Sequence, residues 1–159
     1  MASVSAPVRR ASPADEGYRR LLVPITGSAE SARAMETACA LAAEHGASIT
    51  VAYVIEVSPL LPLDARMDEE EAEARDALAR AEAIADAFGL KVHRHTIRAR
   101  DAGRAVVELV EDENMELVVI AAQRPRRFHG RGPAFGGIVR HVLVKAPCRV
   151  LVVSDRAAA

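Results

Sequence analysis

Short apolar runs alternate along this chain with longer stretches in which apolar residues recur at helical spacing. The apolar runs are Leu21–Ile25, Ser48–Val57, Lys91–Ile97, Leu117–Ala121 and Arg149–Val153. The helical stretches are Glu30–His45, Asp68–Phe88, Asp101 to about Glu111, and about Gly137 to Val144. Strands that alternate with helices in this way are typical of βαβ units on a parallel sheet. The pattern therefore predicts an α/β fold with five strands and four helices.

Two of the runs, LVVI at 117–120 and VLVV at 150–153, are apolar without interruption. Strands of this kind are expected where helices cover both faces of a sheet. We therefore predict a Rossmann-like, doubly wound, five-stranded parallel sheet with helices on both faces. Ligands of such sheets bind beyond the carboxyl ends of the strands, where the strand order reverses. The loops after the first and fourth strands are therefore the candidate site.

The size and composition of the chain exclude several classes of protein. A length of 159 residues fits one domain, which we expect over residues 18–154 with tails at 1–17 and 155–159. No apolar run approaches the roughly 20 residues that cross a bilayer, and residues 1–17 lack the apolar core of a signal peptide, so we expect a cytoplasmic protein. With 21 basic and 22 acidic residues and no Trp, we expect no nucleic acid partner.

Local signals set the expected ends and faces of the helices. Ser28 can cap the first helix and Gly46 can end it. The acidic run at 68–71 stands in the first turn of the second helix, where carboxylates complement the helix dipole and need no bound cation. The inward face of that helix is expected to carry four apolar residues: Leu78, Ala81, Ala85 and Phe88.

Residues able to perform catalysis are few. The sequence has no Gly-x-Ser-x-Gly elbow, Walker motif or His-Glu-x-x-His helix, so we do not expect an enzyme. His93 and His95 fall on one face of the third strand, but no third ligand stands nearby in the sequence, and we expect them to be exposed or hydrogen-bonded. Cys39 and Cys148 lie in apolar surroundings and are interpreted as buried, reduced thiols.

The two candidate loops differ in how strongly they indicate a ligand. The first, from Pro24 to Ser28, is compatible with a plain capped turn as well as with an anion at the helix N-terminus. The second runs from Ala122 to Phe135 and ends at Gly136-Gly137. It carries four arginines that are suited to forked hydrogen bonds with phosphate, although a solvated basic loop is the alternative. They are Arg124, Arg126, Arg127 and Arg131.

Several segments together resemble the universal stress protein family. They are Leu21-Leu22-Val23-Pro24, the second strand around Val51–Ile55, Gly136-Gly137, and Ala146-Pro147-Cys148 followed by the strand 149–153. The similarity spans about residues 18–154. It implies a nucleotide-binding fold and a homodimer formed through the last strand, Arg149 to Val153, whose edge is otherwise unpaired.

The sequence departs from the nucleotide-binding members of that family at the motif positions. Thr26 stands in place of an Asp, while Ala121 and Arg124 stand in place of two glycines. Eleven residues (125–135) then separate Arg124 from Gly136 instead of nine. Carried over by resemblance, Pro24, Ile25, Thr26 and Val54 would flank a base or ribose. The residues Gly136, Gly137 and Ile138 would lie under phosphates.

These observations leave three hypotheses. The first is a regulatory domain that binds ATP, another adenine nucleotide or a similar phosphate-bearing ligand. The second is a dimerisation and interaction module whose pocket has decayed, and the third is a slow ATP hydrolase. The Arg-rich loop followed by Pro-Ala-Phe-Gly-Gly is similar to stress-protein domains associated with transporters, which by analogy implies a possible membrane transporter partner.

Overall fold

The computed structural model describes residues 17–122 and 137–154, which form one parallel sheet with helices on both faces. The strands are β1 (Arg20–Ile25), β2 (Ser48–Glu56), β3 (Val92–Ala99), β4 (Leu117–Ala121) and β5 (Arg149–Val153). The helices are α1 (Ala29–His45), α2 (Asp68–Ala87), α3 (Ala102–Asp112) and α4 (Gly137–Lys145). The predicted fold class is confirmed.

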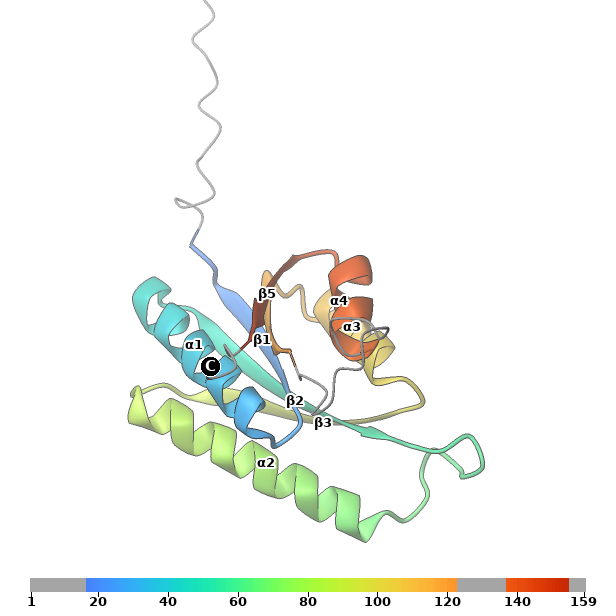
Figure 1. The fold of residues 1–159 in the computed structure, drawn as a ribbon. Coiled ribbons are helices and arrows are strands. Elements are labelled where there is room, and N and C mark those ends of the chain that lie inside the picture. The colour runs from blue at the N-terminus through green and yellow to red at the C-terminus, as the bar shows by residue number, and fades with distance from the viewer. Residues whose placement is uncertain (1–16, 123–136, 155–159) are drawn as a thin grey trace, which may run out of the picture.

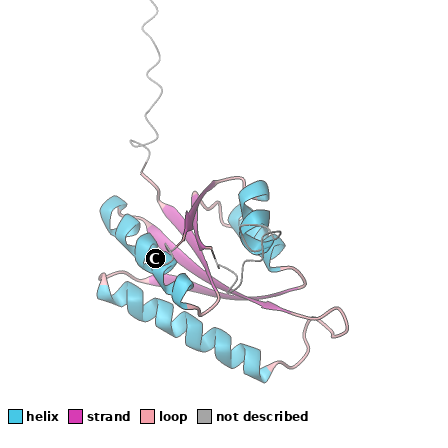
Figure 2. Ribbon diagram, in the orientation of Figure 1, coloured by secondary structure: helices cyan, strands magenta, loops and turns pink. Residues whose placement is uncertain are grey.

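The strands lie in the order β3-β2-β1-β4-β5, so the direction of winding reverses between β1 and β4. Helices α1 and α2 cover one face, and α3 and α4 cover the other (Figures 1 and 2). In β1, Leu21, Val23 and Ile25 pack on the side of α1 and α2, whereas Leu22 packs on the side of α3 and α4. Burial on both faces explains why these strands read as continuous apolar runs.

The helix ends follow the predicted chemistry. Ser28 caps α1 by accepting the N–H of Ser31 at 3.2 Å, and Gly46 ends it at φ 64°, with its own N–H donated to Ala42 O. Asp101 caps α3 through the N–H of Arg104 at 2.9 Å. The acidic run 68–71 occupies the first turn of α2 as expected. In the described part of the chain no cluster of His, Cys, Asp and Glu is suited to hold a metal.

Two expectations about burial are wrong. Phe88 is exposed, because α2 ends at Ala87 and Phe88 lies in the turn that leads to Gly89, beyond the face that packs on the sheet. Leu78, Ala81 and Ala85 are buried as predicted. Cys148 is only half-buried, because it precedes the edge strand β5, whereas Cys39 is fully buried in α1.

None of the helices within 17–122 and 137–154 is long and apolar enough to cross a membrane.

Burial of Cys39 predicts a loss of stability at alkaline pH. Removal from water, and then the nearby Glu36 carboxylate, raise the pKa of the Cys39 thiol from 9.0 to about 11. The folded state therefore holds this proton more tightly than the unfolded state, and the resulting stability, complete below pH 9, is lost as pH rises toward 11. Between pH 8 and pH 10 the protein should lose about 1 kcal/mol of unfolding free energy through this group.

Urea unfolding at the two pH values measures this loss. The Cys39→Ala variant lacks the thiol and serves as the control, since it should be less stable overall but less sensitive to pH by that amount. An equal pH dependence in the two proteins would show that Cys39 does not contribute.

Candidate functional site

A pocket lies at the carboxyl ends of the central strands, where the winding of the sheet reverses between β1 and β4. It has a volume of about 170 Å³. Parallel sheets place ligands in this crevice because the loops after the two central strands leave toward opposite faces. The lining residues come from three strands, the β1–α1 loop and helices α1, α3 and α4: Pro24, Ile25, Thr26, Ser31, Ala52, Val54, Ala102, Val106, Ile120, Ala121, Gly137, Ile138 and Val139.

The β1–α1 loop and the first turn of α1 each bring one hydroxyl group to the pocket, from Thr26 and Ser31. The Thr26 N–H donates to Ser31 Oγ at 2.9 Å, and Thr26 Oγ1 lies 3.0 Å from the same oxygen. The capping hydroxyl of Ser28 completes the cluster, since it lies 3.2 Å from Ser31 Oγ. Ser31 is only 4% exposed, so its hydroxyl depends on these contacts. The cluster fixes the loop and sets an uncharged polar edge on an otherwise apolar cavity.

The opposite wall is apolar and is built from small or branched side chains. Ala52 and Val54 come from β2, and Ala102 and Val106 lie one turn apart on α3. The N-terminus of α3 is already occupied, because Glu56 Oε1 accepts the Ala102 N–H at 3.1 Å while Asp101 caps the next turn. Since two carboxylates accept the N–H groups of Ala102 and Arg104, the start of α3 already carries negative charge and is a poor site for an anion.

Helix α4 presents a different N-terminus. Its first turn carries no acidic residue, and no atom of residues 17–122 or 138–154 lies within 4 Å of the position that a Cβ on Gly137 would take. The helix dipole is therefore not offset by an acid in this turn. Beside it lies a second, polar recess lined by Glu56, Arg100, Asp101, Gly103, Gly137, Ile138 and His141.

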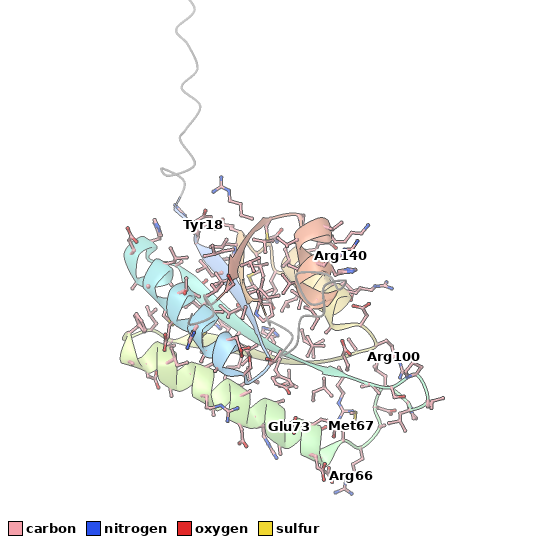
Figure 3. The ribbon with its side chains drawn as sticks, viewed as in Figure 1. Tyr18, Arg66, Met67, Glu73, Arg100 and Arg140 are labelled. Carbon is pink, nitrogen blue, oxygen red and sulfur yellow. The ribbon has the colours of Figure 1, made fainter. Side chains whose placement is uncertain are left out.

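Close packing of α3 against α4 shapes this recess. A Cβ added to Gly103 would lie 2.8 Å from the Cβ of His141, so only glycine allows the two helices to approach as they do. His141 thus lies against α3. Arg100 donates to the carbonyls of Val57 and Ser58 at the rim. Figure 3 shows Arg100 beside the start of the β2–α2 connection.

Seven of the residues predicted from the sequence line this one pocket: Pro24, Ile25, Thr26, Val54, Ala121, Gly137 and Ile138. The other five, Arg124, Arg126, Arg127, Arg131 and Gly136, lie outside the described residues. The structure adds Ser31, Ala102 and Val106, which the sequence analysis missed. Ser31 could have been found from its spacing, because a serine three residues after the cap lies one turn into α1 and close to the loop. Whether any of these residues binds a ligand stays a prediction.

The two histidines of β3 do not belong to this site. His93 and His95 line a separate recess with Ser48 and Thr50, near the start of β2. His95 Nε2 lies 3.1 Å from Glu113 Oε1, at the C-terminal end of α3, and His93 is exposed. This arrangement agrees with the expectation of exposed or hydrogen-bonded histidines.

Comparison with known proteins gives consistent matches over the folded region. The model of the universal stress protein family matches residues 17–154. A universal stress protein of Methanocaldococcus jannaschii is 28% identical over 142 residues, which cover 86% of this chain and 82% of the relative. Among solved structures, a universal stress protein in complex with cAMP superimposes with a TM-score of 0.71 at 23% identity, covering 87% of this chain and 98% of the other. A universal stress protein of Archaeoglobus fulgidus in complex with dAMP gives a TM-score of 0.67 at 20% identity, covering 86% and 98%.

The geometry of the β1–α1 loop predicts a stability difference between two glycine substitutions. Gly27 has φ 78°, and a Cβ there would lie 3.2 Å from the Cβ of Ala77 and 2.9 Å from Arg80 Nη2. Gly46 has φ 64° with nothing within 4 Å, so Gly46→Ala measures backbone strain alone, about 1 kcal/mol. Gly27→Ala should cost about 2 kcal/mol, because α2 must also move. Chemical denaturation measures both, and equal losses would mean that the loop does not press on α2.

Proposed function

Since the chain belongs to the universal stress protein family, we propose that it is a regulatory domain that binds an adenine nucleotide in the pocket between β1 and β4. The observation that carries this proposal is the combination in one crevice of apolar walls, two hydroxyls and a helix N-terminus whose first turn carries no acid. A nucleotide needs these three environments side by side: the apolar walls for its base, the hydroxyls for its ribose and the helix N-terminus for its phosphate. The cAMP and dAMP complexes of the relatives support the choice of an adenine nucleotide.

The base would occupy the apolar part of the pocket. Ala52, Val54 and Val106 have side chains without polar atoms, so they provide an apolar contact surface that suits an aromatic ring. The ribose would then meet the hydroxyls of Thr26 and Ser31. A neutral hydroxyl is a weaker acceptor than the carboxylate that Thr26 replaces, so the ribose should contribute less affinity here than in members with Asp.

The phosphate would lie at the start of α4. The N–H groups near Gly137 face no competing acid in the first turn of the helix, and helix N-termini attract anions. We further propose that the arginines at 124, 126, 127 and 131 add charge-assisted hydrogen bonds to the phosphates. In this arrangement side-chain donors replace the backbone contacts that glycines provide in other members.

We propose binding without turnover. Among the described residues that line the pocket none is acidic, basic or His, so the pocket itself provides no general base. Two carboxylates of the neighbouring recess, Glu56 and Asp101, are engaged with the N-terminus of α3. The alternative to ligand binding is an interaction module with a decayed pocket, which the replacements at Thr26 and Arg124 favour. Regulation of a membrane transporter stays a prediction for either function.

A thermal-shift panel of ATP, AMP, cyclic AMP, cyclic di-AMP and inorganic phosphate tests the proposal. A ligand at 100 times its dissociation constant adds about 2.7 kcal/mol to stability. We expect at least one adenine nucleotide to stabilise the protein, and phosphate alone to do so much less. Stabilisation by none of them would favour the decayed pocket, whereas release of inorganic phosphate from ATP would favour the hydrolase.

Two variants locate the site. Gly137→Val adds bulk where the backbone is open, so it should leave the fold intact and weaken binding of the best nucleotide about ten- to a hundredfold. The fourfold Arg→Ala change at 124, 126, 127 and 131 should have an effect of similar size. Ala43→Val, on the exposed side of α1, is the matched control and should leave affinity unchanged. Unchanged affinity in the folded fourfold variant would contradict the phosphate role of the arginines.

We also propose a homodimer formed through β5. This strand lies at an edge of the sheet and, within the described part of the chain, pairs with β4 alone. It displays Leu151, which is 37% exposed, and the neighbouring helix α4 displays Leu143 and Val144. An apolar strand at the edge of a sheet is stabilised when a second copy pairs with it across a two-fold axis.

Sedimentation equilibrium at micromolar concentration tests the dimer. Leu151→Glu should convert it to a monomer, because a charge would enter the contact between the two strands. Leu151 is chosen for this test because the neighbouring Val152 packs on α3 and α4. A charge at Val152 would therefore affect folding as well as dimer formation. Phe88→Glu, at an exposed apolar position beyond the end of α2, should leave the dimer intact. A wild-type protein that sediments as a monomer would contradict the proposal.

A further inference from the structure

The connection between β2 and α2 displays three leucines to solvent within four residues. Leu60 is 93% exposed, Leu61 44% and Leu63 46%. Single exposed apolar residues are common on protein surfaces, but three together form a patch that marks an interaction surface. Neither the candidate pocket nor β5 includes these residues.

The connection is held in a defined shape by its own turns. The N–H of Leu61 donates to Ser58 O at 3.0 Å, and the N–H of Ala65 donates to Pro62 O at 3.0 Å, so two β-turns follow one another. Pro59, at the second position of the first turn, restricts the backbone further.

Two arginines from the end of β3 anchor this connection to the domain. Arg98 donates to Leu63 O at 3.3 Å and to Ala65 O at 2.5 Å, and its guanidinium also pairs with Glu71 of α2. Arg100 donates to the carbonyls of Val57 and Ser58. Figure 3 shows Arg66 and Met67 where the connection enters α2. The leucines are therefore presented on an ordered support, which lowers the entropy lost when a partner binds.

Residues 58–71 carry five carboxylates and one arginine, and Arg98 and Arg100 reach this segment from the end of β3, so its net charge is negative. Asp64 lies beside Leu63, and Glu69 and Glu70 are exposed in the first turn of α2. Within the described residues these three carboxylates form no ion pair, whereas Asp68 pairs with Arg66, and Glu71 with Arg98. The patch therefore combines apolar contact area with a negative margin.

We propose that Leu60, Leu61 and Leu63 form a docking surface for a basic amphipathic helix of a partner protein. The apolar face of such a helix would pack on the three leucines. Lysines or arginines beside that face would pair with Asp64, Glu69 and Glu70. The same carboxylates repel an anionic membrane surface. A second copy of this chain that paired through the same patch would bring two negatively charged margins together, so it fits less well.

The binding test uses a helical peptide of 14 residues, composed of leucine and lysine at amphipathic spacing and labelled for fluorescence anisotropy. The full chain should bind it, and the affinity should fall as salt increases. The combined variant Leu60→Ser, Leu61→Ser, Leu63→Ser should bind at least about tenfold more weakly, and Glu69→Gln with Glu70→Gln should reduce the salt dependence. Phe88→Ser is the matched control, since it removes an exposed apolar side chain elsewhere, and it should bind like the wild type.

Circular dichroism and the midpoint of thermal unfolding establish that the triple variant is folded, which is expected because all three side chains are exposed. Equal affinity of the triple variant and the wild type for the peptide would overturn the proposal. So would leucine-dependent binding to vesicles of phosphatidylcholine, with or without phosphatidylglycerol. A change in sedimentation of the triple variant would also overturn it, because the occupant would then be a second copy.

Discussion

The pairing of β1 with β4 is the constraint on which the rest of this structure depends. The two strands are parallel neighbours, yet the chain leaves β1 toward β2 and β3 on one side and leaves β4 toward β5 on the other. Side chains of both strands are buried on both faces of the sheet. Each strand therefore contributes to two cores, one beneath α1 and α2 and the other beneath α3 and α4. The Glu116 carboxylate, just before β4, accepts the N–H groups of Arg19, at 2.6 Å, and Arg20, at 3.1 Å. It thereby joins the start of β4 to the start of β1. These backbone hydrogen bonds, led by that of Arg19, lower the pKa of Glu116.

The pocket follows directly from that pairing. The winding of the sheet reverses between the two strands, and the described residues that border the space above their carboxyl ends are mostly small or branched. The two helix N-termini at its border differ in whether acidic side chains already accept their N–H groups. The start of α3 is satisfied by Asp101 and Glu56, while the start of α4 has no acid in its first turn. The start of α4 therefore suits an anion better than the start of α3 does, and the hydroxyls of Thr26 and Ser31 lie on the β1 side of the same cavity.

Much of this architecture could be predicted from the sequence because local and global signals agree. Continuous apolar strands, the caps at Ser28 and Asp101, and the glycine at 46 each have a local physical cause, and the element ends differ from expectation by one or two residues. Features that depend on packing between distant segments could not be predicted in this way. Contact between Gly103 and His141 needs the crossing of α3 and α4, and the exposure of Phe88 depends on where the sheet stops covering α2. The ordered leucines at 60, 61 and 63 depend on Arg98 and Arg100, which follow more than thirty residues later.

We have proposed that an adenine nucleotide binds between the loops after β1 and β4. A titration of the isotopically labelled protein with AMP, followed by ¹H–¹⁵N correlation spectra, tests this proposal residue by residue. We expect saturable shifts of the amides of Thr26, Val54, Ala121 and Gly137, which line the pocket. The amides of Ser48, His93 and Glu116, at the other end of the sheet, should remain unchanged. Saturation with shifts confined to that other end, or no shift at millimolar AMP and ATP, would contradict the claim.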